Sequence, residues 1–286
     1  MPEKNKYTLF KVFYFGEHYH GSQRQPKLPT IEGKLLNALN NKGYLSDEHY
    51  KDQIIHSAGR TDAGVHSRGM TYGFYNQRDV FHPIEVNTSL PEEIIIWSSG
   101  SSDLNDDKSP KVHPRYQALQ RHYKYFFLDS QHVLNLDIVQ ETIDKLIGSH
   151  DFRNFSKFEQ DKNTVRTVDQ ISVETVGNLW IFDFKARSFL WNQIRKMMRV
   201  IIQIGSQQWL SDVLISLFNP RDLKYALKVE PISPNGLILW DVTYPSHMEF
   251  QHCRKSIQKL NSHLSSWVDE LKIKKSLLDS INDSFQ

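Results

Sequence analysis

The chain has 286 residues, 39% of them hydrophobic and 24% charged, with a formal net charge of +2, which suits two ordinary domains or one large one. Its single cysteine, Cys253, excludes internal disulfides and any cysteine-based zinc cluster. The sequence contains no secretory signal and no apolar run of about 20 residues, so we expect a soluble, cytoplasmic protein without a membrane span.

The first half of the chain begins with a predicted strand and a predicted helix. Residues Tyr7–Phe15 are β-branched and aromatic enough for a strand that is buried on both faces. Thr30 is typical of a helix N-cap, and the helix that follows should end near Asn41. The loop between these elements carries the polar motif H-G-S-Q-R-Q-P. Its Gln23 and Arg24 suit contact with RNA, although a solvated loop explains them equally well.

The most informative stretch is Gln53–Arg78, which contains the string G-R-T-D-A-G-V-H. Its flanks are rich in β-branched and aromatic residues, which predicts two strands joined by a loop between two glycines. Asp62 is the only acid in this stretch, and Arg60 lies two residues before it. We expect the carboxylate to be ionised and positioned by the fold. The plainer interpretation is an Asx-type turn between two strands.

Residues 99–110 are the best candidate for a linker, because they contain many turn formers, an acidic patch and no apolar run. We therefore predict an N-terminal α+β domain over 1–108, a C-terminal α+β domain over 109–245 and a helical extension over 246–286. In the extension, hydrophobic residues recur at helical spacing, namely Leu260, Leu264, Trp267 and Leu271. We expect this helix to pack on the body of the protein or against a partner subunit.

The second domain begins with a predicted strand over 121–128. Alternation along it places Arg121, Tyr123 and Tyr125 on one face. A tyrosine beside arginines can stack on a nucleic-acid base, although most tyrosines in strands are ordinary core residues.

A helix from about Leu136 to Gly148 and a hairpin of Val168–Val176 and Leu179–Ala186 should follow. The next segment, A-R-S-F-L-W-N-Q-I-R-K-M-M-R-V-I-I-Q-I-G, has the spacing of a helix with one apolar side. Arg195 lies beside that apolar side, where a buried arginine would need an anionic partner. A surface arginine on an amphipathic helix is the simpler interpretation. Residues 235–244 then predict a closing strand.

The positive charges are concentrated in four segments that contain many lysines and arginines but one acidic residue, Asp62. These segments are His18–Ile31, Gln53–Arg78, Lys108–Leu128 and Phe184–Ser211. Segments of one sign that are separated in sequence suggest a basic surface assembled by the fold, as expected for contact with a phosphate backbone. A scattered basic surface without a ligand is the alternative.

Four motifs resemble those of the TruA family of tRNA pseudouridine synthases. G-R-T-D-A-G-V-H is similar to the signature whose Asp, here Asp62, is the catalytic nucleophile. R-H-Y-K-Y resembles R-R-Y-x-Y, whose first tyrosine contacts the target uracil and corresponds to Tyr123. The segment ending F-L-W-N-Q-I-R resembles the motif whose arginine, here Arg195, pairs with that Asp. H-G-S-Q-R-Q-P resembles G-W-Q-R-Q, with Ser22 in place of the tryptophan of bacterial members, and is more similar to archaeal members.

The resemblance covers nearly all of residues 7–244 and adds detail to the expected fold and function. We expect an α+β protein of two similar halves, each a mixed antiparallel sheet with helices on one face, and the resemblance implies that they meet around a central basic cleft. It also implies a homodimer that isomerises uridine to pseudouridine in the anticodon stem-loop of tRNA, without a metal, nucleotide or redox cofactor.

The resemblance also assigns roles to individual residues. Asp62 would attack the sugar or abstract a proton from it, Arg195 would keep Asp62 deprotonated, and Tyr123 would hold the detached base. The RNA itself would be contacted by Arg60, Gln23 and Arg24.

Two other functions are open at the level of sequence. A non-catalytic RNA-binding protein would explain the basic segments, but it gives no reason for an acid among them. A glycoside or nucleoside hydrolase breaks the same type of bond but normally uses two carboxylates, whereas the central stretch has only Asp62.

Overall fold

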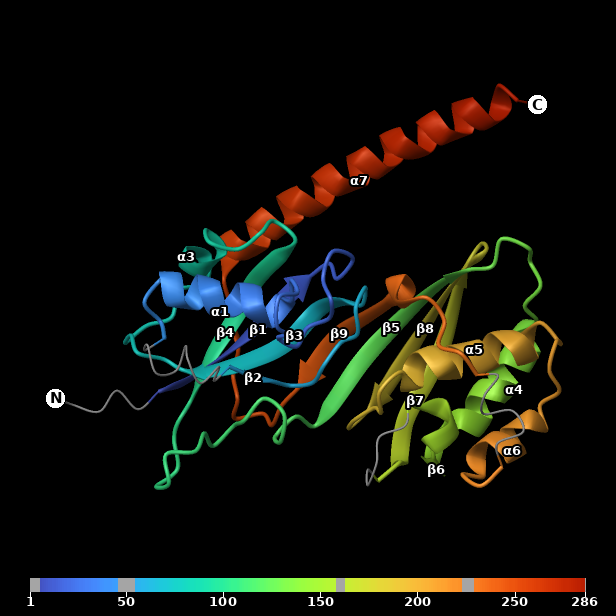
Figure 1. The fold of residues 1–286 in the computed structure, drawn as a ribbon, viewed down its shortest axis with the longest axis horizontal. Helices are drawn as coiled ribbons and strands as arrows, with labels where there is room; N and C mark the ends of the chain where they lie inside the picture. Colours follow the sequence, from blue (N-terminus) through green and yellow to red (C-terminus); the bar gives the residue numbers. More distant parts are fainter. Residues whose placement is uncertain (1–5, 46–54, 158–162, 223–228, 286) are drawn as a thin grey trace.

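The computed structural model describes residues 6–45, 55–157, 163–222 and 229–285 (Figure 1). Its strands form one continuous ten-stranded sheet in the order β10-β4-β1-β3-β9-β5-β8-β7-β6, with β2 paired to β3 at the side. The strands are β1 (Tyr7–Tyr14), β2 (His56–Ser57), β3 (His66–Tyr75), β4 (Ile94–Ser102), β5 (Gln120–Leu128), β6 (Gly148–Asp151), β7 (Val165–Val176), β8 (Leu179–Ala186), β9 (Leu237–Thr243) and β10 (Gln251–His252).

Strand β9 joins the two halves of the sheet. It pairs in parallel with β3, where His66 lies opposite Ile238, and antiparallel with β5. The other strand pairs among the described residues are antiparallel. The last strand of the predicted C-terminal domain therefore lies directly beside a strand of the N-terminal one (Figure 1). The predicted α+β class with a mixed sheet is confirmed, and the domain limits stay a prediction.

Three helices pack on one face of this sheet: α1 (Ile31–Asn41), α4 (Leu136–Leu146) and α5 (Gln193–Gly205). One hydrophobic core lies under α1 and another under α4 and α5, and Tyr123 of β5 contacts both. The shorter helices are α3 (Pro83–Asn87) and α6 (Val213–Phe218), with 3-10 turns at Arg153–Phe155 and Pro234–Gly236. The two cores therefore meet on the helical face near β5.

Several local predictions are confirmed at the level of hydrogen bonds. The Thr30 side chain accepts the Gly33 N–H and caps α1, and β7 and β8 form the predicted hairpin. The predicted linker is partly wrong, because Ser99–Ser102 continue β4 and pair with β1. Main-chain pairing with β1 does not need apolar side chains, so the polar composition concealed this end of the strand. Residues 53 and 54 of the strand expected before Asp62 lie outside the described residues.

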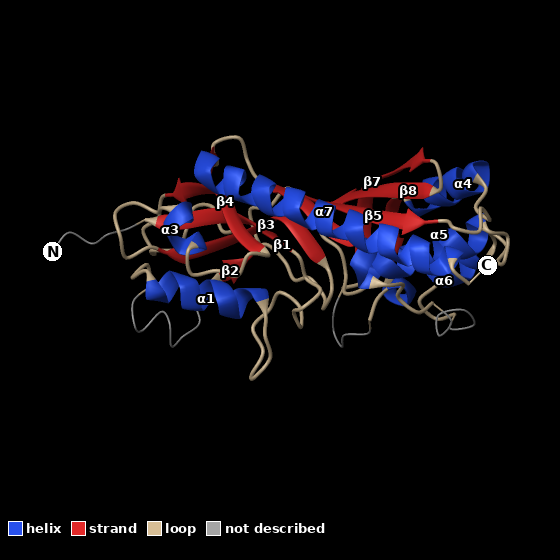
Figure 2. Ribbon diagram, turned by 90° about the horizontal axis from the view of Figure 1, so that it is seen from above, coloured by secondary structure: helices blue, strands red, loops and turns tan. Residues whose placement is uncertain are grey.

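The C-terminal extension is a long helix, α7 (Arg254–Asp283), on the opposite face of the sheet from α1. Phe13 packs against it, whereas the neighbouring residues Val12 and Tyr14 face α1. The predicted apolar positions Leu260, Leu264 and Trp267 pack on the sheet, but Leu271 is 65% exposed. Figures 1 and 2 show why: α7 runs across the sheet, and its C-terminal half rises away from the strands. Among the described helices, none combines the length and apolar character of a membrane span.

Candidate active site

The loop that carries Asp62 connects β2 to β3 and is fixed at its C-terminal end, beside β3. Gly64 has φ +81, and a Cβ there would lie 2.7 Å from Cγ of Pro234, so both the backbone and the packing require glycine. His66 accepts the Gly16 N–H at 3.1 Å through Nδ1, and its Nε2 bonds to the Asn235 carbonyl at 3.0 Å. Burial lowers the pKa of His66, which keeps the ring neutral. The loop is therefore held between the two halves of the chain.

The N-terminal end of the loop is held by residues that sequence reasoning did not identify as structural. Ser22 is 2% exposed, and its hydroxyl accepts the Thr61 N–H at 2.8 Å while its own N–H donates to the Thr61 carbonyl at 3.0 Å. The Tyr14 hydroxyl bonds to Oγ1 of Thr61 at 2.8 Å. The N–H, carbonyl and hydroxyl groups of Thr61, the residue before Asp62, are thus all hydrogen-bonded. Ser22 holds the loop through two of these bonds. The motif H-G-S-Q-R-Q-P marked this segment, but nothing in it indicated the buried hydroxyl.

Asp62 and Arg195 form an ion pair. Nη1 of Arg195 lies 3.1 Å from Oδ2 of Asp62, and their side chains are 14% and 26% exposed, respectively. Arg195 is on the first turn of α5 and also donates through Nε to the Ile232 carbonyl at 2.7 Å. The same Nη1 contacts Oδ1 of Asn192 at 3.2 Å, and Asn192 has a left-handed backbone with φ 65. Arg195 is thus anchored on two sides and presents one nitrogen to the carboxylate.

Tyr123 lies on β5 next to this pair. Its ring packs edge-to-face on Phe189 at 5.5 Å between centroids. Burial raises the pKa of Tyr123 to about 12, with Arg121 lowering it and Asp62 raising it. The phenol is therefore protonated near neutral pH, and its hydroxyl is close enough to Asp62 to sense that charge. The structure brings together Asp62, Arg195 and Tyr123.

The other predicted site residues, Gln23, Arg24 and Arg60, are exposed beside the Asp62 loop and do not enter the ion pair. The Arg24 N–H donates to Oε2 of Glu32 on α1 at 2.7 Å. Burial raises the pKa of Glu32, whereas the Arg24 N–H and the charges of Arg60 and Arg24 lower it. Arg24 and Arg60 therefore lie close enough to Glu32, in the first turn of α1, to act on its charge, and both side chains are exposed.

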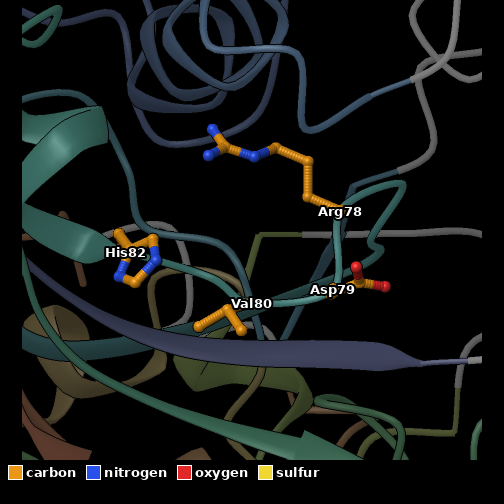
Figure 3. Close-up of a pocket in the computed structure, with 4 residues that line it drawn as sticks. All are labelled: Arg78, Asp79, Val80 and His82. Atoms are coloured by element: carbon orange, nitrogen blue, oxygen red, sulfur yellow. The ribbon is translucent and has the colours of Figure 1, made fainter.

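A separate hollow lies between β3 and α3 and is lined by Arg78, Asp79, Val80 and His82 (Figure 3). The Arg78 guanidinium already binds Glu85 at 2.8 Å and the Lys42 carbonyl at 3.1 Å, so its charge is engaged within the protein. The described residues contain no group of three His, Cys, Asp or Glu side chains that could hold a metal ion. The candidate site is therefore the Asp62–Arg195–Tyr123 cluster.

Comparison with known proteins was made on sequence and on fold. The model of a family described as tRNA pseudouridine synthase matches residues 142–245. A tRNA pseudouridine synthase A of Methanococcoides burtonii is 34% identical over 266 residues, which covers 90% of this chain and 91% of the relative. One of Archaeoglobus fulgidus is 34% identical over 264 residues, which covers 91% of each chain. Among solved structures, a Cbf5-Nop10-Gar1 complex is 12% identical with a TM-score of 0.35, over 69% of this chain and 45% of that chain.

Proposed function

The chain belongs to the tRNA pseudouridine synthase family, and from this premise we propose that Asp62 is the carboxylate with which it isomerises uridine in tRNA. The observation that carries this proposal is the ion pair with Arg195 at 3.1 Å. A lone acid in a basic stretch would repel RNA, so binding alone gives no reason for it. A paired and partly exposed carboxylate has the charge and the access that a nucleophile needs.

The reaction exchanges one carbon–nitrogen bond for one carbon–carbon bond. In the proposed course, a carboxylate oxygen of Asp62 attacks C1′ of the ribose, and the C1′–N1 bond breaks with its electron pair going to uracil. The base then turns so that C5 attacks C1′, which releases the Asp62 carboxylate. The proton on C5 is lost and N1 gains one, so the product is an isomer of the substrate. No oxidant or phosphoryl donor enters this balance, and we propose no cofactor.

Arg195 and Tyr123 have distinct proposed roles around this carboxylate. A guanidinium beside Asp62 places a positive charge next to its carboxylate and fixes the direction of the bonded oxygen. Tyr123 provides a flat ring next to the carboxylate, on which the detached uracil can stack. Because its pKa is raised to about 12, its hydroxyl can donate a hydrogen bond near neutral pH but cannot serve as a base.

The substrate base must leave its stack to reach Asp62, which needs a surface that holds the surrounding RNA. We assign that contact to the exposed side chains of Gln23, Arg24 and Arg60, which flank the Asp62 loop. From the resemblance to the TruA family, the proposed targets are uridines of the anticodon stem-loop. The proposed assembly is a homodimer that works in the cytoplasm.

The direct test is to map pseudouridine in tRNA incubated with the purified wild type and Asp62→Ala. Asp137→Ala is a matched control, because Asp137 is an exposed acid on the first turn of α4. We expect the control to modify tRNA normally and Asp62→Ala to bind tRNA without forming pseudouridine. Activity of Asp62→Ala within about tenfold of the wild type would contradict the assignment, because loss of a covalent nucleophile costs far more.

A further inference from the structure

Arg121 is a buried cation outside the Asp62–Arg195 pair. It is 9% exposed, and all of its described hydrogen bonds go to main-chain carbonyls. Nη1 donates to the Arg187 carbonyl at 2.5 Å, and Nη2 donates to the carbonyls of Ala58 at 2.6 Å and Arg115 at 3.0 Å. Among the described residues, no carboxylate forms an ion pair with Arg121.

Such a cation is costly to bury. Removing a guanidinium from water without a counter-charge is strongly unfavourable unless its donors are satisfied. Burial is the main cause that lowers the pKa of Arg121; the nearby Tyr244 and Tyr123 raise it, whereas the charges of Arg115 and Arg187 lower it. The side chain nevertheless stays charged near neutral pH, because an arginine pKa starts far above that range. Its charge therefore strengthens three hydrogen bonds to the main chain. This arrangement indicates that the three bonded segments must be held in a fixed position.

Each of the three carbonyls lies where a segment of the candidate active site leaves or approaches a strand. Ala58 begins the loop to Asp62, four residues later. Arg187 follows the end of β8 and precedes the turn that leads into α5 and Arg195. Arg115 lies in the segment that leads into β5, the strand of Arg121 and Tyr123. One guanidinium thus connects the loop of the carboxylate, the approach to its arginine, and the strand of the stacking tyrosine.

We infer that Arg121 is a positioning residue, which sets the Asp62 loop and the approach to α5 in register with Tyr123. This inference rests on the proposed catalytic role of Asp62. Only a planar guanidinium can direct separate N–H groups to carbonyls on three different segments. A lysine carries its donors on one nitrogen and cannot reach all three. The inference therefore predicts that charge alone does not replace Arg121.

The test compares Arg121→Lys, which keeps the charge, with Arg121→Gln, which keeps N–H donors but removes the charge. Single-turnover rates are measured at saturating tRNA, together with tRNA affinity and the melting temperature of each variant. We expect both variants to form pseudouridine about tenfold or more slowly, the factor that accompanies loss of one hydrogen bond to a charged group. We expect tRNA affinity within about threefold of the wild type, because Arg121 is buried and does not face the RNA.

Rates are taken below the melting temperature of each protein, so that unfolded enzyme does not mimic slow chemistry. If Arg121→Lys does not fold, the rate of Arg121→Gln tests the positioning role instead. Glutamine leaves no unpaired charge in the core, so this variant is less disruptive to folding. Arg221→Ala is the control: Arg221 is an exposed arginine outside the four basic segments and outside this network, and we expect a normal rate at saturating tRNA.

Three results would overturn the positioning role: a normal rate for Arg121→Lys, a loss confined to tRNA affinity, or slow rates explained by unfolding alone. Asp62→Ala in the same assay separates this inference from the proposed function. An active Asp62→Ala would refute the catalytic assignment itself. An inactive Asp62→Ala together with a fully active Arg121→Lys would refute the positioning role alone.

Discussion

Asp62 and Arg195 lie 133 positions apart in the chain and meet at 3.1 Å between Oδ2 and Nη1. The carboxylate belongs to the loop between β2 and β3, and the guanidinium to the first turn of α5. The pair therefore forms only when the two halves of the sheet are joined, which β9 achieves by pairing with β3 and β5. The candidate site is therefore complete only in the folded protein, with both halves of the sheet in place.

Gly64→Ala should impair pseudouridine formation, and Gly59→Ala should not. Gly64 has φ +81, a conformation that costs an L-residue roughly 1–2 kcal/mol, and its new Cβ would press on Pro234. Gly59 has no positive φ and no heavy atom within 4 Å of a new Cβ. Both variants are compared by single-turnover rate at saturating tRNA. Equal rates for the two would show that the turn at Gly64 does not limit the placement of Asp62.

Ser22→Ala should slow the reaction while leaving tRNA affinity nearly unchanged. The substitution removes the acceptor of the Thr61 N–H, and an unsatisfied buried donor costs about 1–3 kcal/mol. The loop can recover part of that loss by moving, which displaces Asp62. The control is Ser101→Ala, since Ser101 is exposed on β4. A Ser22→Ala enzyme that binds tRNA poorly but reacts at the normal rate would assign Ser22 to the RNA surface instead.

Tyr123→Phe should retain more activity than Tyr123→Ala. A base stacked on an aromatic ring contributes roughly 1–3 kcal/mol, and phenylalanine keeps the ring. The pKa of Tyr123, raised to about 12, means that the hydroxyl holds its proton near neutral pH. Rates at saturating tRNA distinguish the two variants. An equal loss in both would give the hydroxyl, rather than the ring, the main role.

His113 should make the folded state less stable as the pH falls from about 6.5 to 4. Burial, together with the nearby His56 and Arg115, lowers the pKa of His113 to about 4. As the pH drops through 6.5, the unfolded chain gains a proton that the folded protein does not accept. Stability is therefore full above this window and is lost within it.

The measurement is urea unfolding at pH 7 and pH 5 for the wild type and His113→Gln. The midpoint should fall less between the two pH values in the variant. His18→Gln serves as the control, since His18 is exposed. The same fall in midpoint for all three proteins would exclude His113 as a source of the acid sensitivity. His56 and His66 contribute in the same direction, because burial lowers their pKa as well.

Local patterns predicted most elements of this fold because their causes are local. Thr30 caps α1, and the turn at Gly177 and Asn178 joins β7 to β8, as their sequences indicate. The parallel pairing of β3 with β9 was not predictable in this way, since it joins residues that are remote in sequence. The exposed end of α7 also escaped prediction, because Leu271 continues the apolar spacing of Trp267 although this part of the helix rises away from the sheet.

The residues of the candidate site also fall into two groups: those that the sequence identified and those that only the structure shows. Asp62, Tyr123 and Arg195 could be named because their motifs resemble those of a known family, and the fold brings them together. Periodicity alone favoured a surface position for Arg195. The supports of the site, Ser22 and Arg121, depend on burial and on carbonyls contributed by distant segments. No spacing in the sequence encodes such contacts, so only the three-dimensional structure could reveal them.

Arg195 gives the sharpest test of the ion pair. Arg195→Lys keeps the positive charge but loses the arrangement in which Nε binds the Ile232 carbonyl while Nη1 binds Asp62. A single ammonium group cannot hold both partners in the same way, so the single-turnover rate should fall markedly. Arg195→Ala should be slower still, because it leaves a partly buried carboxylate without its cation, a loss that costs about 3–5 kcal/mol when both charges are fully buried and less here.

The competing explanation is that Arg195 holds an RNA phosphate rather than Asp62. It predicts weaker tRNA binding that becomes worse with added salt, and a normal rate once tRNA saturates the enzyme. Arg199→Ala is the matched control, since Arg199 lies one turn further along α5 and its side chain donates a hydrogen bond to the Glu230 carbonyl rather than to Asp62. If Arg195→Ala regains the wild-type rate at saturating tRNA, the ion pair has no part in the chemistry. If it stays slow while Arg199→Ala reacts normally, the guanidinium acts on Asp62, because a lost phosphate contact would have been overcome by the excess of tRNA.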